Sequence, residues 1–275
     1  MTNQTSELLP VEQSAALRQK THTLGEEAAL FLADRSATSP WQRVIVCDFE
    51  FIYDMDAFKR YQVAENDATQ GFVRWPFHRV VAGAWCMLTI SPDMNRPVVT
   101  NVEVITDQPE EDIVGAFFTL CSAFQDARII SWGGEAKDFL CLKRAAMERG
   151  MVLPLQLRDP APFARTRLDL SSAVRSLGHY VHLPEFCEAI GVASKPLPSK
   201  DISLAVRHGA WDHVETQVVA DVCTIARVAW RYFLATGAAS GSPGAGDKAI
   251  VAALAERFPG DGWLAKLASP VQLAA

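Results

Sequence analysis

The chain has 275 residues, which is enough for one large domain or two small ones. Hydrophobic residues make up 49% and charged residues 21%, as in ordinary globular proteins, and no apolar run approaches the roughly 20 residues that cross a bilayer. The net charge of −6 argues against a broad surface that coats nucleic acid, but it does not exclude an enzyme that meets a phosphodiester through bound metal and a local basic groove.

The N-terminus and the cysteines both favour a cytoplasmic protein without a membrane partner. Residues 1–7 lack the basic start and apolar core of a secretion signal. The cysteines are scattered without a C-x-x-C pair, and each has largely apolar neighbours: Cys47, Cys86, Cys121, Cys141, Cys187 and Cys223. We therefore expect buried free thiols rather than a zinc site or a disulfide framework.

The first part of the chain predicts a helical extension followed by strands. Apolar residues recur at roughly helical spacing over 6–34, so we expect an N-terminal helical extension over 1–40. The β-branched run at 44–51 predicts a buried strand. The polar and aromatic segment 53–77 has no clear periodicity, and its length predicts an excursion over the surface near a functional site.

The rest of the chain changes from strands to an alternation of helices and strands. Strands at 79–89 and 98–105 would complete an antiparallel meander with the first strand, and a further strand is predicted at 128–132. Helices are predicted at 107–124, 138–149, 169–177, 183–190 and 211–234. Strands first and alternation afterwards predict an α/β domain over 41–235, with a mixed sheet flanked by helices.

Two further segments follow this domain. Residues 236–247 are rich in Gly, Ala and Ser, which predicts a flexible linker. Residues 248–275 are expected to form a short helical tail, with an amphipathic stretch at 248–267.

Two carboxylates mark the far end of the first strand. Asp48 and Glu50 are two residues apart, so their side chains leave the strand on the same face. Like charges so close are costly to desolvate, and a divalent cation is the simplest compensation. The alternative is a strand end that reaches solvent.

Other acids stand in the second half of the chain. Asp221 is embedded in an apolar stretch of a predicted helix, for which there is no cheap structural explanation. Asp138 and Asp169 each stand at a predicted helix start and are good candidates for N-terminal caps; we interpret Asp169 as a cap. Glu135 is either an extra ligand or a solvated loop acid.

The order of these acids resembles that of the DEDD superfamily of 3′-to-5′ exonucleases, in particular the predicted exonucleases related to the proofreading domain of family B DNA polymerases. The similar segments are 46–50, 130–139 and 215–222, together with 75–82, 168–170 and 183–191. The resemblance implies a ribonuclease H-like fold with a mixed five-stranded sheet, an antiparallel meander followed by parallel strands.

By this resemblance, Asp48, Glu50, Asp138 and Asp221 would bind two divalent cations, Mg²⁺ or Mn²⁺. The implied activity is removal of nucleotides from the 3′ end of single-stranded DNA or RNA. The family places a water-orienting Tyr or His near the last Asp, but here Gln217 and Thr216 stand at those positions. The amide of Gln217 can still hold a water.

His213 is the substitute base that the sequence offers, because it lies two helical turns before Asp221; the alternative is a solvent-facing histidine. For substrate binding we consider Lys137 as a phosphate contact, and Phe51 and Phe139 as rings that stack on bases. We place Phe51 on the side of the acids.

Two other interpretations remain open. One is a catalytically weak or silent member of the superfamily that binds nucleic acid or a protein, which the Gln217 position motivates. The other is an assembly protein that docks to a protein partner through 6–34 or 248–267 and binds no metal.

Overall fold

The computed structural model describes residues 42–65, 72–161, 164–175, 180–194 and 202–268. The chain divides into two compact units, 1–40 and 41–275, and all of the described residues belong to the second. The N-terminal extension predicted over 1–40 therefore lies outside the described residues.

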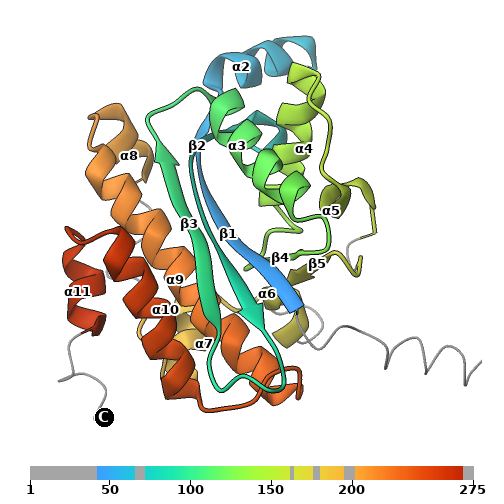
Figure 1. The fold of residues 1–275 in the computed structure, drawn as a ribbon. Coiled ribbons are helices and arrows are strands. Elements are labelled where there is room, and N and C mark those ends of the chain that lie inside the picture. Colours follow the sequence, from blue (N-terminus) through green and yellow to red (C-terminus); the bar gives the residue numbers. More distant parts are fainter. Residues whose placement is uncertain (1–41, 66–71, 162–163, 176–179, 195–201, 269–275) are drawn as a thin grey trace, which may run out of the picture. The chain divides into compact units, whose positions relative to one another are not determined.

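A mixed five-stranded sheet forms the centre of this unit (Figure 1). Its strands are β1 (Gln42–Tyr53), β2 (His78–Ile90), β3 (Val98–Thr106), β4 (Arg128–Ser131) and β5 (Arg167–Asp169), in the spatial order β3-β2-β1-β4-β5. The first three strands pair antiparallel, and β4 and β5 join in parallel. The predicted α/β, ribonuclease H-like arrangement is thus confirmed.

Helices cover both faces of the sheet. The main ones are α3 (Glu110–Ala123), α4 (Asp138–Arg149), α9 (Trp211–Ala235) and α10 (Pro243–Arg257); shorter ones are α2 (Met55–Ala64), η1 (Trp75–Phe77), α5 (Leu155–Arg158), α6 (Leu170–Val174), α7 (Leu183–Ala189), α8 (Ile202–Arg207) and α11 (Gly262–Ala268). Helix α9 packs along β1, β2 and β3, whereas α3 and α4 contact β2. None of the helices that the structure describes has the length and apolar character of a bilayer span.

Strand β1 separates two hydrophobic cores because its side chains alternate between the faces of the sheet. Val44 and Val46 belong to the core that contains the buried face of α9. Ile45, Cys47 and Phe49 belong to the core built with α3 and α4. Even-numbered positions of β1 therefore face α9, and the two acids of this strand are even-numbered.

The prediction of a flexible linker over 236–247 is wrong from Pro243 onward, because α10 begins there. The hydroxyl of Ser242 caps the helix by accepting a hydrogen bond from the N–H of Ala245. Helix α10 packs on α9, and buried residues of it and of α11 join the core shared with α9: Ile250, Val251, Leu254 and Leu264. These apolar side chains of the tail are used inside the unit, which leaves them unavailable for docking a protein partner.

Glycine at position 246 is required by the contact between α10 and α9. A Cβ added to Gly246 would lie 2.0 Å from Nε1 of Trp230, whereas one added to Gly244 would meet nothing within 4 Å. We expect Gly246→Ala to lower the free energy of unfolding by about 1–3 kcal/mol through overpacking. Gly244→Ala, in the same helix, should leave stability unchanged or raise it by up to about 1 kcal/mol. Denaturant unfolding of both variants measures these changes. Equal changes in the free energy of unfolding would contradict the close contact between Gly246 and Trp230.

Candidate active site

Three carboxylates from two elements meet at one place. Asp48 and Glu50 project from β1, and Asp221 projects from α9. One oxygen from each of them lies within 4.8 Å of the other two. The structure thus brings together three of the four acids predicted as metal ligands.

The packing of α9 against β1 produces this convergence. Asp221 lies in a helix whose neighbouring residues are almost all buried, and it is itself only 4% exposed. Asp48 and Glu50 are half-buried on the strand face that α9 covers. Three acids at one low-dielectric place repel each other strongly, which a bound cation relieves.

The three oxygens fit a divalent cation. Oxygens bound to one Mg²⁺ at about 2.1 Å lie at most about 4.2 Å apart, so the observed group needs only a small inward movement. Hard carboxylate oxygens are also the donor type that Mg²⁺ and Mn²⁺ select. The residues present therefore fit the metal that the sequence predicts.

The fourth predicted ligand, Asp138, is the first residue of α4 and lies outside that group of three. Its side chain is not the N-cap, because Lys137 occupies that position and makes no capping hydrogen bond. The pKa of Asp138 is raised to about 7, mainly by burial; the charge of Lys137 opposes this shift, and the charges of Asp169 and Asp221 add to it. Because the charge of Asp221 acts on Asp138, Asp138 borders the same site.

This raised pKa predicts a measurable pH dependence. Folded Asp138 keeps its proton to a higher pH than the unfolded chain does, so its contribution to the free energy of unfolding falls as pH rises from about 4 to about 7. In EDTA, Asp138→Asn should remove that loss. The free energy of unfolding of the variant should then exceed that of the wild type by on the order of 3 kcal/mol at pH 8, but the two should be equal at pH 4. Thermal unfolding at both pH values checks this, and parallel curves for the two proteins would contradict it.

Asp169 is the helix cap that the sequence predicts, and it also holds the loop before Asp138. Its carboxylate accepts hydrogen bonds from the N–H and the hydroxyl of Ser172 at the start of α6. The same carboxylate accepts a bond of 2.7 Å from the N–H of Gly133. This second contact spans 36 residues and has no sequence signal beyond the glycine, whose φ of +79° favours that residue type.

Gln217 contacts Asp221 directly. Its Nε2 donates to Oδ2 of Asp221 at 3.3 Å, and its Oε1 is buried without a hydrogen-bond partner among the described residues. Thr216, at the other position where the family has a helper, lines a pocket beside Arg257 instead. His213 lies about 12 Å from Asp221 along the axis of α9, and it is outside the group of acids. It therefore stays a prediction that the geometry does not favour.

Of the three predicted substrate contacts, only Lys137 is not buried. Phe51 shares the core of Phe49, so its predicted place beside the acids is wrong; residues two apart leave a strand on one face. Phe139 is fully buried in the same core and cannot stack on a base. The ammonium of Lys137 lies 4.2 Å from the centre of the Phe51 ring, and its charge acts on Asp138.

Glu135 is neither a ligand nor a solvated acid. Its Oε1 accepts a hydrogen bond of 2.6 Å from Nε of Arg167, whose side chain is completely buried. The remaining donors of Arg167 bind the carbonyls of Gln156, Asp159 and Ala161. The pair fixes the loop between β4 and α4 to the segment before β5, and it was missed because nothing in the local sequence marks a contact across 32 residues.

No curated protein matches the sequence. Among solved structures, the family B DNA polymerase of the hyperthermophilic archaeon Pyrobaculum calidifontis is similar, with 16% identity and a TM-score of 0.49 over 79% of this chain and 29% of the polymerase chain. The chain thus spans less than a third of that polymerase's length.

A family model gives the more specific result. The model described as a predicted 3′-5′ exonuclease related to the exonuclease domain of PolB matches residues 70–193, which include Asp138 and the loop before it. The predicted resemblance to exonucleases related to family B DNA polymerases is therefore confirmed over residues 70–193.

Proposed function

We propose that the protein is a metal-dependent 3′-to-5′ exonuclease that hydrolyses phosphodiester bonds at the ends of single-stranded DNA or RNA. The observation that carries the proposal is the convergence of Asp48, Glu50 and Asp221, with oxygens within 4.8 Å, in a chain that matches an exonuclease-related family. Asp138 borders that group and would complete a set of four ligands for two cations. Two divalent cations in such a site activate water and stabilise the leaving oxygen.

The side chains around the acids have separate tasks in this proposal. Gln217 holds Asp221 through Nε2, and its buried Oε1 accepts a hydrogen bond from the attacking water. Lys137 neutralises a substrate phosphate near Asp138. Asp169 keeps the loop before Asp138 in place by binding Gly133. The buried free thiols fit a reducing compartment, so we place the activity in the cytoplasm.

The second candidate is a weak or silent member of the superfamily that binds nucleic acid or a protein. It is favoured by Gln217, which has no useful basicity and is only 1% exposed. The four retained acids argue against it, because unneutralised carboxylates destabilise a fold that has lost its metal.

Incubation of the protein with single-stranded DNA or RNA and Mn²⁺ separates these candidates. Single-stranded DNA and RNA labelled at the 5′ end should give a ladder that shortens from the 3′ end, and EDTA should abolish it. Unchanged bands for both nucleic acids would overturn the proposed activity. A Mn²⁺-dependent rise in melting temperature under the same conditions would still identify the metal site.

A variant of Gln217 tests how water is positioned. Gln217→Met keeps the side-chain volume but removes both the acceptor Oε1 and the Nε2 donor to Asp221, so we expect kcat to fall at least about tenfold with little change in KM. Single-turnover shortening of a labelled strand measures the effect. Thr216→Val, in the adjacent position that faces another pocket, should leave kcat unchanged. Equal rates for Gln217→Met and wild type would remove Gln217 from the mechanism.

A further inference from the structure

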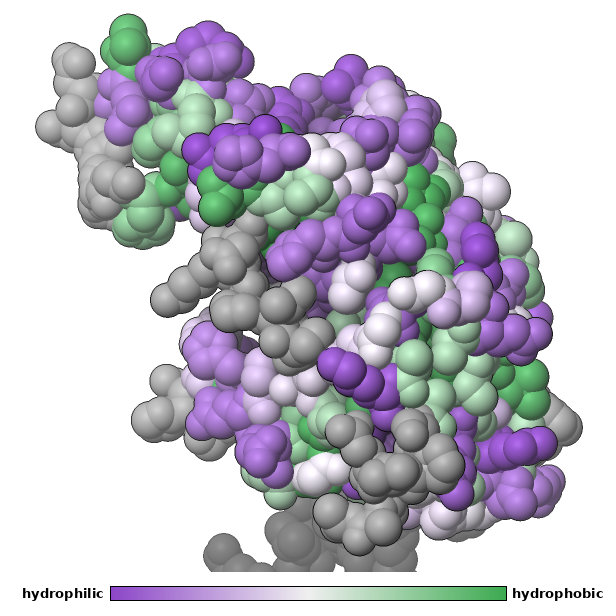
Figure 2. All heavy atoms as spheres, turned by 90° about the vertical axis from the view of Figure 1, so that its left-hand side faces the viewer, coloured by the Kyte–Doolittle hydropathy of each residue, from purple (hydrophilic) through white to green (hydrophobic). Residues whose placement is uncertain are grey.

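A pocket of about 590 Å³ lies between α6, α7, α9 and the turn that joins α9 to α10. Its apolar walls include Val174, Phe186, Ile190, Val228 and Ala235. Of the described residues that line it, only Arg231 is charged, and Tyr232 is the only other polar one. Hydrophobic and hydrophilic residues are mixed over the face of the molecule in Figure 2, so this almost wholly apolar lining is a local feature. Its size and its few polar groups are typical of a site for a small molecule.

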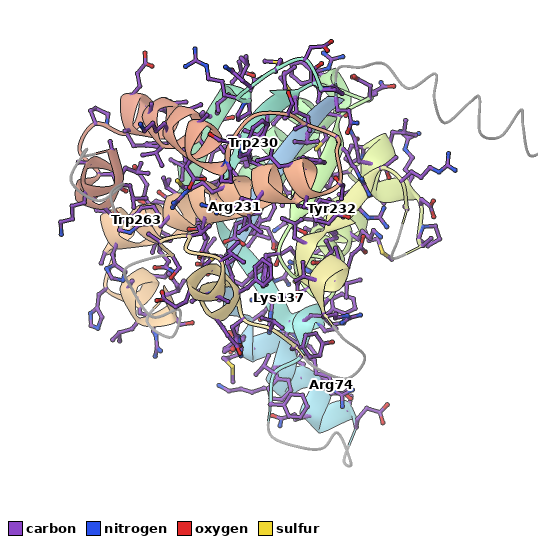
Figure 3. All side chains as sticks on the ribbon, turned by 90° about the horizontal axis from the view of Figure 1, so that it is seen from below. Arg74, Lys137, Trp230, Arg231, Tyr232 and Trp263 are labelled. Carbon is purple, nitrogen blue, oxygen red and sulfur yellow. The ribbon has the colours of Figure 1, made fainter. Side chains whose placement is uncertain are left out.

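The pocket is distinct from the acidic site. Arg231 follows Asp221 by ten residues in α9, which separates the two by about 15 Å along the helix axis. None of the three clustered acids lines the pocket. Helix α7 and the turn between α9 and α10 lie in the lower part of Figure 1, and Figure 3 views the molecule from that side with Arg231 and Tyr232 labelled.

The wall of the pocket carries an excess of positive charge. Arg227 and Arg231, one turn apart in α9, both pair with Oδ2 of Asp247 in α10, at 3.2 and 2.8 Å. Neither guanidinium has another ion pair among the described residues, so two positive charges share one negative charge. Arg227 and Asp247 are buried, and Nε of Arg231 is buried without a hydrogen-bond partner in the described part of the chain. A buried excess charge is costly, and an anion beside Arg231 would compensate it.

Arg231 can bind an anion and keep its present partners. Its Nη1 donates to the carbonyl of Ile190 at 3.2 Å, and its Nη2 donates to Asp247. Each of these nitrogens carries a second hydrogen. The side chain is 23% exposed and lines the pocket, so a ligand can reach it. Two hydrogens on neighbouring nitrogens suit the two oxygens of a carboxylate.

The pocket is preformed, because the segments around it are attached to their neighbours. The hydroxyl of Ser240 donates to the carbonyl of Met94 at 3.2 Å. The backbone of Gly241 lies so close to the carbonyl of Asn95 that a Cβ has no room there. The turn before α10 is thus fixed on the loop between β2 and β3, and the bond from Arg231 to Ile190 attaches α7 to α9. A preformed pocket loses little entropy when a ligand binds.

We propose that this pocket binds a long-chain carboxylate, with the alkyl chain along the apolar walls and the carboxylate at Arg231. The walls disfavour a nucleotide, because the polar edges of a base would be left without hydrogen-bond partners. The apolar chain gains from leaving water, while the guanidinium selects the charged head. The proposal goes beyond the proposed function and does not depend on it.

Isothermal titration calorimetry of the full chain in the absence of metal tests this proposal. The probes are decanoate and its neutral counterpart decan-1-ol, each below the concentration at which it aggregates. The wild type should bind decanoate about tenfold or more tightly than the alcohol, because hydrogen bonds to charged groups are the stronger ones. Arg231→Met should bind the two probes equally, whereas Arg231→Lys should keep the preference for decanoate.

The variants are chosen so that the fold is preserved. Asp247 keeps Arg227 as its ion-pair partner when Arg231 is replaced. Ala235 lines the pocket but is exposed, so Ala235→Trp can fill the opening without entering the core and should weaken binding of both probes by about tenfold or more. The matched control is Arg175→Met. Arg175 is exposed directly after Val174 and does not line the pocket, so this variant should bind both probes as the wild type does.

The possible outcomes decide the inference without reference to exonuclease activity. A loss of the preference for decanoate in Arg231→Met but not in Arg175→Met supports it. It is overturned if decanoate gives no saturable heat, or if the wild type binds the two probes equally. Decanoate binding that neither Arg231→Met nor Ala235→Trp changes would place the ligand elsewhere and overturn it as well. Thymidine monophosphate represents the rival ligand class, and its tighter binding at Arg231 would identify a nucleotide pocket instead.

Discussion

Replacement of Asp221 by asparagine should lower the rate of 3′-end shortening by more than about a hundredfold. Loss of a residue that only supports a metal ligand typically costs 10–100-fold, and Asp221 is itself in the group of oxygens within 4.8 Å. Asparagine has nearly the same volume but carries no charge, so the helix should keep its packing while the site loses affinity for cations. Initial rates with a 5′-labelled strand, measured over a range of Mn²⁺ concentrations, give the effect.

Asp212→Asn is the control, because this exposed acid lies in the same helix outside the group of three. It should retain the wild-type rate. The Mn²⁺-dependent rise in melting temperature should vanish in Asp221→Asn and persist in Asp212→Asn. An Asp221→Asn protein that works within a few fold of the wild type at every Mn²⁺ concentration would remove this carboxylate from the ligand set.

Truncation of Arg167 should give the largest loss of stability. Its guanidinium is fully buried and binds Glu135 together with three backbone carbonyls. Arg167→Ala leaves a largely buried carboxylate without its counter-ion, which typically costs about 3–5 kcal/mol. For a unit of this size that corresponds to a fall in melting temperature of about 6–20 °C, measured by circular dichroism.

Arg43→Ala provides the comparison, because Arg43 also forms a bidentate pair, with Asp126, but on the surface. The side chains of that pair are 41% and 60% exposed, so its loss should cost no more than about 1 kcal/mol. Similar shifts for Arg43→Ala and Arg167→Ala would show that burial of the Glu135 pair contributes nothing.

The parts of the site that depend on local sequence could be predicted. Asp48 and Glu50 share a face because strand periodicity is two, and Asp221 stands out because a carboxylate in an apolar helix needs a partner. The same rule of alternation places Phe51 with Phe49, and its assignment to the acid side was an error in applying that rule.

Contacts between distant segments could not be predicted. The ion pair of Glu135 and the bond from Gly133 to Asp169 join residues more than 30 positions apart, where propensity and spacing carry no information. The composition of 236–247 indicated a linker because glycine, alanine and serine are common in linkers, yet in α10 Gly246 serves close packing against Trp230. Tertiary packing overrode the local signal there.

The alternation of β1 between two cores has a consequence for how this strand tolerates change. Insertion or deletion of one residue between Val44 and Glu50 would exchange the two faces, so every apolar residue of the strand would meet the wrong core and both carboxylates would turn toward α3 and α4. Insertion or deletion of two residues would keep each side chain on its own face and shift only the position of the acids along the strand. In this strand the alternation of odd and even positions between the two faces decides both whether the cores can form and whether the carboxylates can meet.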